Sequence, residues 1–168
     1  MGEPIGFRRL PPGLLASAAV ALPLAAASAQ HSPYAGEQGR DIKALSVREV
    51  ADLLAGRGMG MARAAELNGY PGPMHVLELR DRLGLTPEQE AAVRASFARM
   101  EAAAKPLGAE LVERERALDR AFAGAAVTTD ALRSMTAAIG DVQGRLRAVH
   151  LAAHVETRAV LTEEQVRA

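Results

Sequence analysis

The sequence has no cysteine and no tryptophan, and aromatic residues make up only 3% of its 168 positions. The lack of cysteine excludes disulfides, thiolate metal sites and cysteine nucleophiles together. A metal site in this chain must therefore use histidine, methionine, aspartate or glutamate. β-Branched and aromatic residues, which favour strands, are scarce, whereas the common alanine, leucine, glutamate and arginine favour helices. The composition therefore predicts an all-α protein.

An excess of charge of either sign is also missing, because 20 basic residues face 20 acidic ones. A chain without surplus Lys and Arg displaces few counterions from a phosphate backbone, so nucleic acid is not expected as a partner. The sequence shows no phosphate loop, nucleotide fingerprint or serine in a nucleophile-elbow context. No constellation of residues therefore supports an enzyme.

Residues 1–29 have the pattern of a cleaved export signal. Arg8 and Arg9 give a positive start, residues 14–27 form an apolar stretch, and Ala27-Ser28-Ala29 matches an A-x-A cleavage site. The alternative is a retained membrane anchor, but the apolar stretch is too short to span a bilayer and contains a proline. We expect an exported protein with no later segment able to enter a membrane stably.

After cleavage the mature chain would start at Gln30. Loss of two arginines and one glutamate leaves 18 basic and 19 acidic residues, a formal charge of −1. The remaining chain is expected to divide into three parts: a flexible, turn-rich N-terminal arm at 30–45, an N-terminal helix with a Gly/Pro-rich linker at 46–73, and a helical hairpin domain at 74–168.

The first helix is predicted from a capping box formed by Ser46 and Glu49. Glycines at 56, 58 and 60 interrupt the helical pattern, which resumes over residues 62–67 before a run of Asn, Gly and Pro ends it. A short amphipathic helix is then expected over residues 74–83, closed by Gly84.

Two long helices follow. The first begins at Thr86, with a proline at the first helical position and Gln89 completing a capping box. Its apolar seam is formed by Val93, Phe97, Met100, Ala104, Leu107, Leu111 and Leu118, with Arg114 as the one exception. Pro106 is expected to kink it. After a turn at 124–129, the second seam is formed by Leu132, Met135, Ile139, Val142, Leu146, Val149 and Ala153.

Together the two helices predict an antiparallel hairpin. One apolar seam per helix gives little core, so a third layer must come from residues 46–67, from residues 74–83 or from a second chain, and we expect a homodimer. Gly140 and Gly144, one turn apart on the second helix, either permit close helix approach or merely weaken the helix.

The sequences LTPEQ at 85–89 and LTEEQ at 161–165 flank this hairpin. The arrangement resembles the periplasmic Spy/CpxP family, which includes zinc-resistance-associated proteins and is related to periplasmic heavy-metal sensors. The resemblance covers residues 74–168 and leaves residues 30–73 unexplained. It implies a bent antiparallel hairpin with a short helix before it, commonly paired into a cradle-shaped dimer.

The resemblance also implies a function without catalysis. Members of the family bind unfolded proteins without ATP, bind metal, or report envelope stress to a membrane-bound partner. The motif residues carry no chemistry there. We therefore interpret them here as structural helix caps, namely Thr86, Gln89, Thr162 and Gln165.

His150 and His154 lie four residues apart on the second long helix, so both imidazoles leave one helix face. This spacing suits chelation of Zn, Ni, Co or Cu. The alternative is a pair of solvated or interface histidines. A helical zinc protease needs glutamate directly after the first histidine, and Leu151 stands there, which argues against a zincin-type hydrolase.

His75 and Glu78 share one face of the short helix before the hairpin. Counting residues back from the two turns places His75 about one helical turn, or about 5 Å, from the level of His154. We therefore expect His75, Glu78, His150 and His154 to converge on a divalent metal ion. This is similar to the related metal sensors, in which histidines of the first short helix meet His and Met of the last, although those sensors have a second histidine where Glu78 stands.

Methionines offer softer ligands. Met74 is a candidate fifth ligand, and Met59 and Met61 between glycines allow a copper site, although flexible packing is the alternative for all three. The favoured function is a periplasmic stress or heavy-metal-resistance protein that binds or senses a divalent metal. The alternative is an ATP-independent chaperone for unfolded periplasmic proteins, which the neutral charge weakens because a cationic surface would capture clients better.

Overall fold

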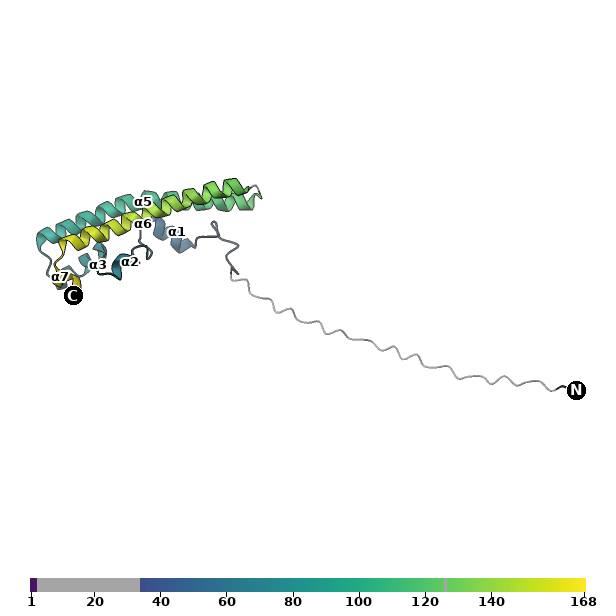
Figure 1. Cartoon of the computed structure of the whole chain (residues 1–168), viewed down its shortest axis with the longest axis horizontal. Helices are drawn as coiled ribbons and strands as arrows, with labels where there is room; N and C mark the ends of the chain where they lie inside the picture. The colour runs from purple at the N-terminus through teal and green to yellow at the C-terminus, as the bar shows by residue number, and fades with distance from the viewer. Residues whose placement is uncertain (3–33, 126) are drawn as a thin grey trace. The chain divides into compact units, whose positions relative to one another are not determined.

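Two long helices packed side by side dominate the structure (Figure 1). The computed structural model describes residues 1–2 and 34–168 except residue 126, and every regular element in that part of the chain is a helix. Helices α5 (Pro87–Ala123) and α6 (Thr129–Val160) form an antiparallel hairpin. The all-α hairpin expected from composition and apolar spacing is confirmed.

Shorter helices precede and follow the hairpin. They are α1 (Val47–Leu54), α2 (Arg63–Glu66), α3 (Pro73–Glu78), α4 (Arg80–Leu83) and α7 (Glu163–Arg167). α1, α2 and α3 lie along one side of the hairpin (Figure 1). The single helix expected over residues 74–83 is divided at Leu79, whose backbone leaves the helical region. Most of the expected signal peptide and the start of the arm, residues 3–33, lie outside the described residues.

Local sequence signals explain where the long helices begin. Thr86 and Gln89 form a capping box at the start of α5, and the Thr128 hydroxyl accepts the Ala131 N–H at the start of α6. α5 continues past Pro106 without ending, and the hairpin curves gently along its length in Figure 1. The kink expected at Pro106 stays a prediction. No helix in the described part of the chain is both long and apolar enough to cross a membrane.

The main core has three layers, because the chain before the hairpin packs onto it. Leu53 of α1 and Ile42, each 2% exposed, join buried side chains of α5 and α6 in one apolar cluster. The hairpin contributes Ala104, Leu111, Val112, Ile139, Val142 and Leu146. α1 approaches α5 closely at Gly108, where an added Cβ would lie only 2.0 Å from the Leu53 carbonyl oxygen. The third layer that the hairpin needs is thus present within one chain.

A second apolar cluster closes the open end of the hairpin, where α5 begins and α6 ends. Val76 of α3, Val93 of α5 and Leu161 are buried there. Side chains from both LTxxQ segments and their neighbours pack around them: Leu77, Leu83, Leu85, Val160 and Val166. This cluster fixes α3 and α7 beside the ends of the two long helices.

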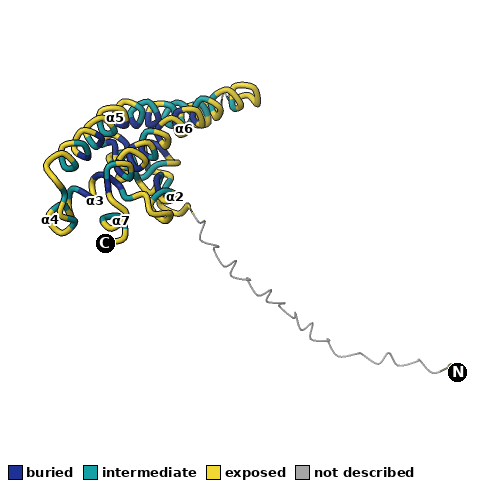
Figure 2. The backbone as a smooth tube through the Cα atoms, turned by 60° about the vertical axis from the view of Figure 1, so that its left-hand side comes forward, coloured by how far each residue is buried: buried dark blue, intermediate teal, exposed yellow. Residues whose placement is uncertain are grey.

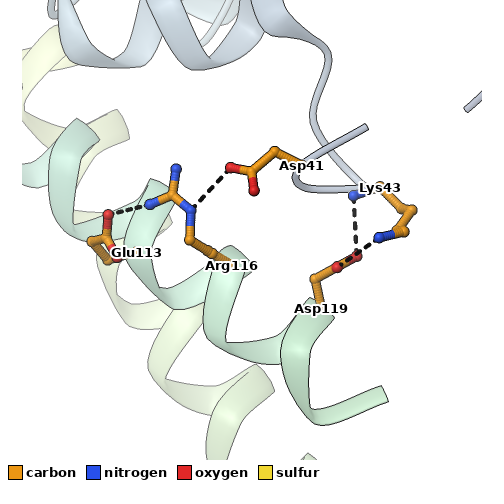
Figure 3. A network of polar contacts seen from close by, with 5 residues as sticks. All are labelled: Asp41, Lys43, Glu113, Arg116 and Asp119. Carbon is orange, nitrogen blue, oxygen red and sulfur yellow. Dashed lines mark hydrogen bonds and ion pairs between the residues drawn. The ribbon is translucent and has the colours of Figure 1, made fainter. Parts of the chain in front are cut away.

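The expected flexible arm is attached to the hairpin in its described part. Figure 3 shows the Lys43 backbone N–H and ammonium both donating to the Asp119 carboxylate, at 3.1 Å each. Arg116 bridges Asp41, at 3.1 Å, and Glu113 (Figure 3). Ile42 lies between these polar contacts and is buried, so residues 41–43 belong to the folded unit.

Exposure rises toward the tip of the hairpin, where Figure 2 shows mostly yellow backbone. Gly140 and Gly144 of α6 are exposed, and a Cβ added to either would meet no atom within 4 Å. Neither glycine therefore mediates a close helix contact within this chain, and the tight helix approach occurs at Gly108 instead.

Candidate functional site

A cavity of about 560 Å³ lies between the hairpin and the segment that runs from the end of α1 to α3. α6 contributes His150 and His154 to its wall, and the covering segment contributes His75. The remaining wall combines carboxylates with soft or apolar side chains: Glu66, Glu101, Met59, Met74, Met100 and Phe97. The three histidines expected to meet therefore line one cavity.

His150 is buried, with 3% of its surface exposed. Its Nε2 has no hydrogen-bond partner among the described residues, and its ring faces the backbone of Gly58, where an added Cβ would lie 3.5 Å from Nδ1. Burial, and secondarily the neighbouring His154, lower the pKa of His150. The ring is therefore neutral near pH 7 and holds a polar nitrogen out of water, which costs about 1–3 kcal/mol when it stays unpaired.

His154 is buried to a similar degree, at 6% exposure, but its ring is oriented by partners. Its Nδ1 lies 2.8 Å from the Tyr70 carbonyl oxygen. Because a carbonyl only accepts, Nδ1 carries the proton, and in the neutral ring Nε2 holds the lone pair. Nε2 lies 3.9 Å from the Glu66 carboxylate. Gly72 gives the ring its room, since a Cβ there would come within 2.9 Å of His154 Cε1.

His75 and Glu78 form a pair on the surface of α3. The His75 Nδ1 lies 3.1 Å from a Glu78 carboxylate oxygen, and both side chains are 61% exposed. His75 also borders the cavity, whereas Glu78 is not among the side chains that line it. The structure thus places Glu78 against His75, and His75 on the wall opposite α6.

The candidate metal-ligating side chains do not converge on one point in the structure. Among residues 34–168, apart from residue 126, no three His, Asp or Glu side chains stand close enough to hold one metal ion together. The residue types nevertheless fit a transition metal, because neutral imidazoles, a carboxylate and thioethers share the cavity and one imidazole nitrogen is buried without a partner.

Met59 and Met61, which the sequence suggested as a joint copper site, have different surroundings. Met59 lines the cavity, while Met61 packs against the main core. Met74 also lines the cavity. Sequence reasoning missed Glu66 and the Tyr70 carbonyl, because their approach to α6 depends on how the glycine-rich segment folds back and no local spacing signals it.

The two LTxxQ segments contact each other at the open end of the hairpin. Gln89 and Gln165 each complete a capping box with the threonine three residues earlier. Their side-chain amides also donate to each other's oxygen, and each amide further donates to a main-chain carbonyl just before the other segment, Val160 or Leu83. Ser46 and Glu49 form the same box at α1 without a partner segment. All three boxes cap helices, and Gln89 and Gln165 also hold the start of α5 against the end of α6.

The fold therefore defines an all-α hairpin protein in which the capping segments of α5 and α7 hydrogen-bond to each other. The chain belongs to the LTXXQ motif family: the description "LTXXQ motif family protein" matches residues 73–168. This is the Spy/CpxP-like family expected from the two motifs, a non-enzymatic family whose membership supports a periplasmic protein of the stress-response kind. No curated protein and no solved structure gives a significant match.

Proposed function

We propose that this chain is an exported, non-enzymatic stress-response protein that binds a divalent transition metal in the cavity beside α6. The observation that carries the proposal is the buried His150 Nε2 without a hydrogen-bond partner. A buried polar atom of this kind needs an explanation, and a metal ion supplies one. The lowered pKa of His150 favours the neutral ring, the form that binds metal.

His154 supplies the second nitrogen, one turn further along α6. The contact between its Nδ1 and the Tyr70 carbonyl leaves Nε2 for the metal. Metal-bound histidines usually donate their other ring N–H to a carbonyl or carboxylate, which fixes the ring and raises its basicity. The buried ring thus has the partner expected of a ligand.

His75 supplies a third nitrogen from α3 after its exposed ring turns into the cavity. Because Glu78 meets the Nδ1 of His75, we assign Glu78 to orient that ring, and not to bind the metal directly as the sequence suggested. Zn, Ni, Co and Cu all accept imidazole ligands, and the nearby thioethers of Met59 and Met74 suit the softer of these ions.

Export forms part of the proposal. The support is the positive start, apolar stretch and A-x-A site within residues 1–29, together with membership of a family of periplasmic proteins. Mass spectrometry of protein from the periplasm should find a chain that starts at Gln30. Full-length protein in the cytoplasm would contradict it.

A chaperone for unfolded periplasmic proteins is the second candidate. Its support is the exposed apolar face of α1, where Val47 is 84% and Leu54 49% exposed. One side of the hairpin is already covered by α1, α2 and α3 of the same chain, which leaves less open apolar surface for clients. Suppression of client aggregation without ATP, in the absence of metal binding, would favour this candidate.

Calorimetric titration with Zn, Ni, Co and Cu tests the metal proposal. The wild type should bind at least one ion much more tightly than about 1 mM, where binding is worth only about 4 kcal/mol. His150→Ala and His154→Ala should each abolish tight binding, and His75→Ala should weaken it. If no ion binds, or if both α6 variants bind like the wild type, the metal proposal fails.

A further inference from the structure

The glycine-rich segment at residues 56–73, which sequence reasoning left unexplained, lies over the two histidines of α6. Gly58 faces the ring of His150, Gly72 faces the ring of His154, and the carbonyl of Tyr70 contacts His154 Nδ1. A Cβ at Gly72 would crowd the His154 ring, whereas a Cβ at Gly58 would meet the His150 ring at an ordinary contact distance of 3.5 Å. The segment therefore covers these rings, and all of it except residue 73 precedes the residues that match the family.

Within this segment, Glu66 of α2 brings a carboxylate toward the same imidazole. Its Oε1 lies 3.9 Å from His154 Nε2. In the neutral ring this nitrogen presents a lone pair, so two electron-rich atoms face each other across a gap too long for a hydrogen bond. A positive charge at this nitrogen, either a proton on the ring or a metal ion in the gap, removes that conflict.

The separation is close to that of two ligands on one metal. Zinc binds imidazole nitrogen and carboxylate oxygen at about 2.0–2.2 Å, and two such ligands at a tetrahedral angle lie about 3.4 Å apart. A shift of about half an ångström by Glu66 closes the difference. Its side chain is 46% exposed and forms no tighter contact with His154, so it is free to make this shift.

We propose that Glu66 is the oxygen ligand of the metal site, opposite His154 Nε2, and that the bound metal fastens residues 56–73 to α6. This assignment rests on the proposed metal binding at His150 and His154. It adds an oxygen ligand to the two imidazole nitrogens of α6. It makes the covering segment the part of the chain that responds to metal. A partner protein that bound this segment would distinguish the metal-bound chain from the metal-free chain.

The test compares Glu66→Gln with Glu101→Gln in calorimetric titrations of the full chain with Zn. Glu101 lines the same cavity but pairs with Lys105, at 3.0 Å, so its variant controls for the loss of one negative charge. Glu66→Gln should weaken Zn binding by more than about tenfold, at least the loss seen when an outer-shell partner is removed. Glu101→Gln should weaken Zn binding by less than about tenfold, because its carboxylate is neither a ligand nor a partner of one.

Hydrogen exchange of residues 56–73 supplies a readout independent of affinity. Zn should slow exchange there in the wild type, and should slow it much less in Glu66→Gln at saturating Zn. If Glu66→Gln binds and protects like the wild type while His154→Gln loses binding, the ligand assignment is wrong and the metal proposal stands. If Glu101→Gln weakens Zn binding as much as Glu66→Gln does, the loss comes from removing a negative charge near the cavity, and Glu66 is not a ligand. If His154→Gln also binds like the wild type, the proposed function fails with it.

Discussion

Gln89 and Gln165 hydrogen-bond to each other across the open end of the hairpin, with each Nε2 donating to the other's Oε1, at 2.9 and 3.0 Å. Each oxygen also accepts the backbone N–H of its own cap residue, Thr86 or Thr162. Each nitrogen further donates to a main-chain carbonyl just before the other segment, that of Val160 or Leu83. Every donor of the two amides is thus used, which explains why both motifs need glutamine and not merely a capping residue.

Replacing Gln89 by glutamate separates these two roles. Glutamate still completes a capping box, but it cannot donate to the Val160 carbonyl or to Gln165. We expect Gln89→Glu to lower the free energy of unfolding by about 1–3 kcal/mol, measured by urea titration. Glu49→Gln changes the same box position at α1, where the side chain hydrogen-bonds to Ser46 and to no second capping segment among the described residues, and it should change the free energy of unfolding by less than about 0.5 kcal/mol. Equal effects would mean that the contact between motifs contributes nothing.

Two glycines on the long helices should respond to alanine in opposite directions. Gly108→Ala would place a Cβ 2.0 Å from the Leu53 carbonyl oxygen, so α1 must move away from α5. We expect a loss of more than about 2 kcal/mol, as for other overpacked cores. Gly144→Ala meets open space and should gain up to about 1 kcal/mol from helix propensity. Thermal unfolding of both variants checks the pair, and a harmless Gly108→Ala would refute the close approach of α1.

Acid should weaken the attachment of the arm. Hydrogen bonds from the Lys43 backbone and side chain lower the pKa of Asp119. The stabilisation is therefore complete above the unfolded-state value, about 3.9, and is lost as the pH falls through the lower folded-state pKa. The difference in stability between the wild type and Asp119→Asn should be constant near pH 7 and shrink below about pH 4. A difference that persists unchanged to pH 2 would contradict this account.

A homodimer remains a prediction, but it no longer follows from an incomplete core. Ile42 and Leu53 provide the third layer that a bare hairpin lacks, so an incomplete core no longer requires a second chain. The remaining support is the family resemblance and the exposed apolar side chains Val47 and Leu54 on α1. Light scattering should report about twice the chain mass at micromolar concentration, and Leu54→Glu should reduce it because a buried charge opposes association. A wild-type mass equal to one chain would exclude the dimer.

Local signals in the sequence were sufficient for the hairpin and its caps. The threonine, proline and glutamine at residues 86–89 locate the start of α5, and the spacing of Val142 and Leu146 identifies a core face of α6. Counting residues back from the two turns predicted His75 near the level of His154, because helical rise is constant, and both residues do line one cavity. These inferences needed only short-range rules.

The contacts of the segment before the hairpin were beyond such rules. Ile42 is one apolar residue in a polar stretch, and nothing local indicates that it enters the core. Glu66 and Tyr70 reach His154 only because the chain folds back over α6 after Gly60. Gly72 belongs to what the sequence suggests is a linker, and the need for glycine there is clear only from the His154 ring that lies opposite it.

The nitrogen chemical shifts of the imidazole rings, measured by NMR before and after addition of Zn, test the central claim most directly. The account predicts that the Nε2 signals of His150 and His154 change together at one equivalent of Zn, while the Nδ1 of His154 stays protonated on the Tyr70 carbonyl. Unchanged Nε2 signals for both α6 histidines, with Zn binding elsewhere or not at all, would contradict it.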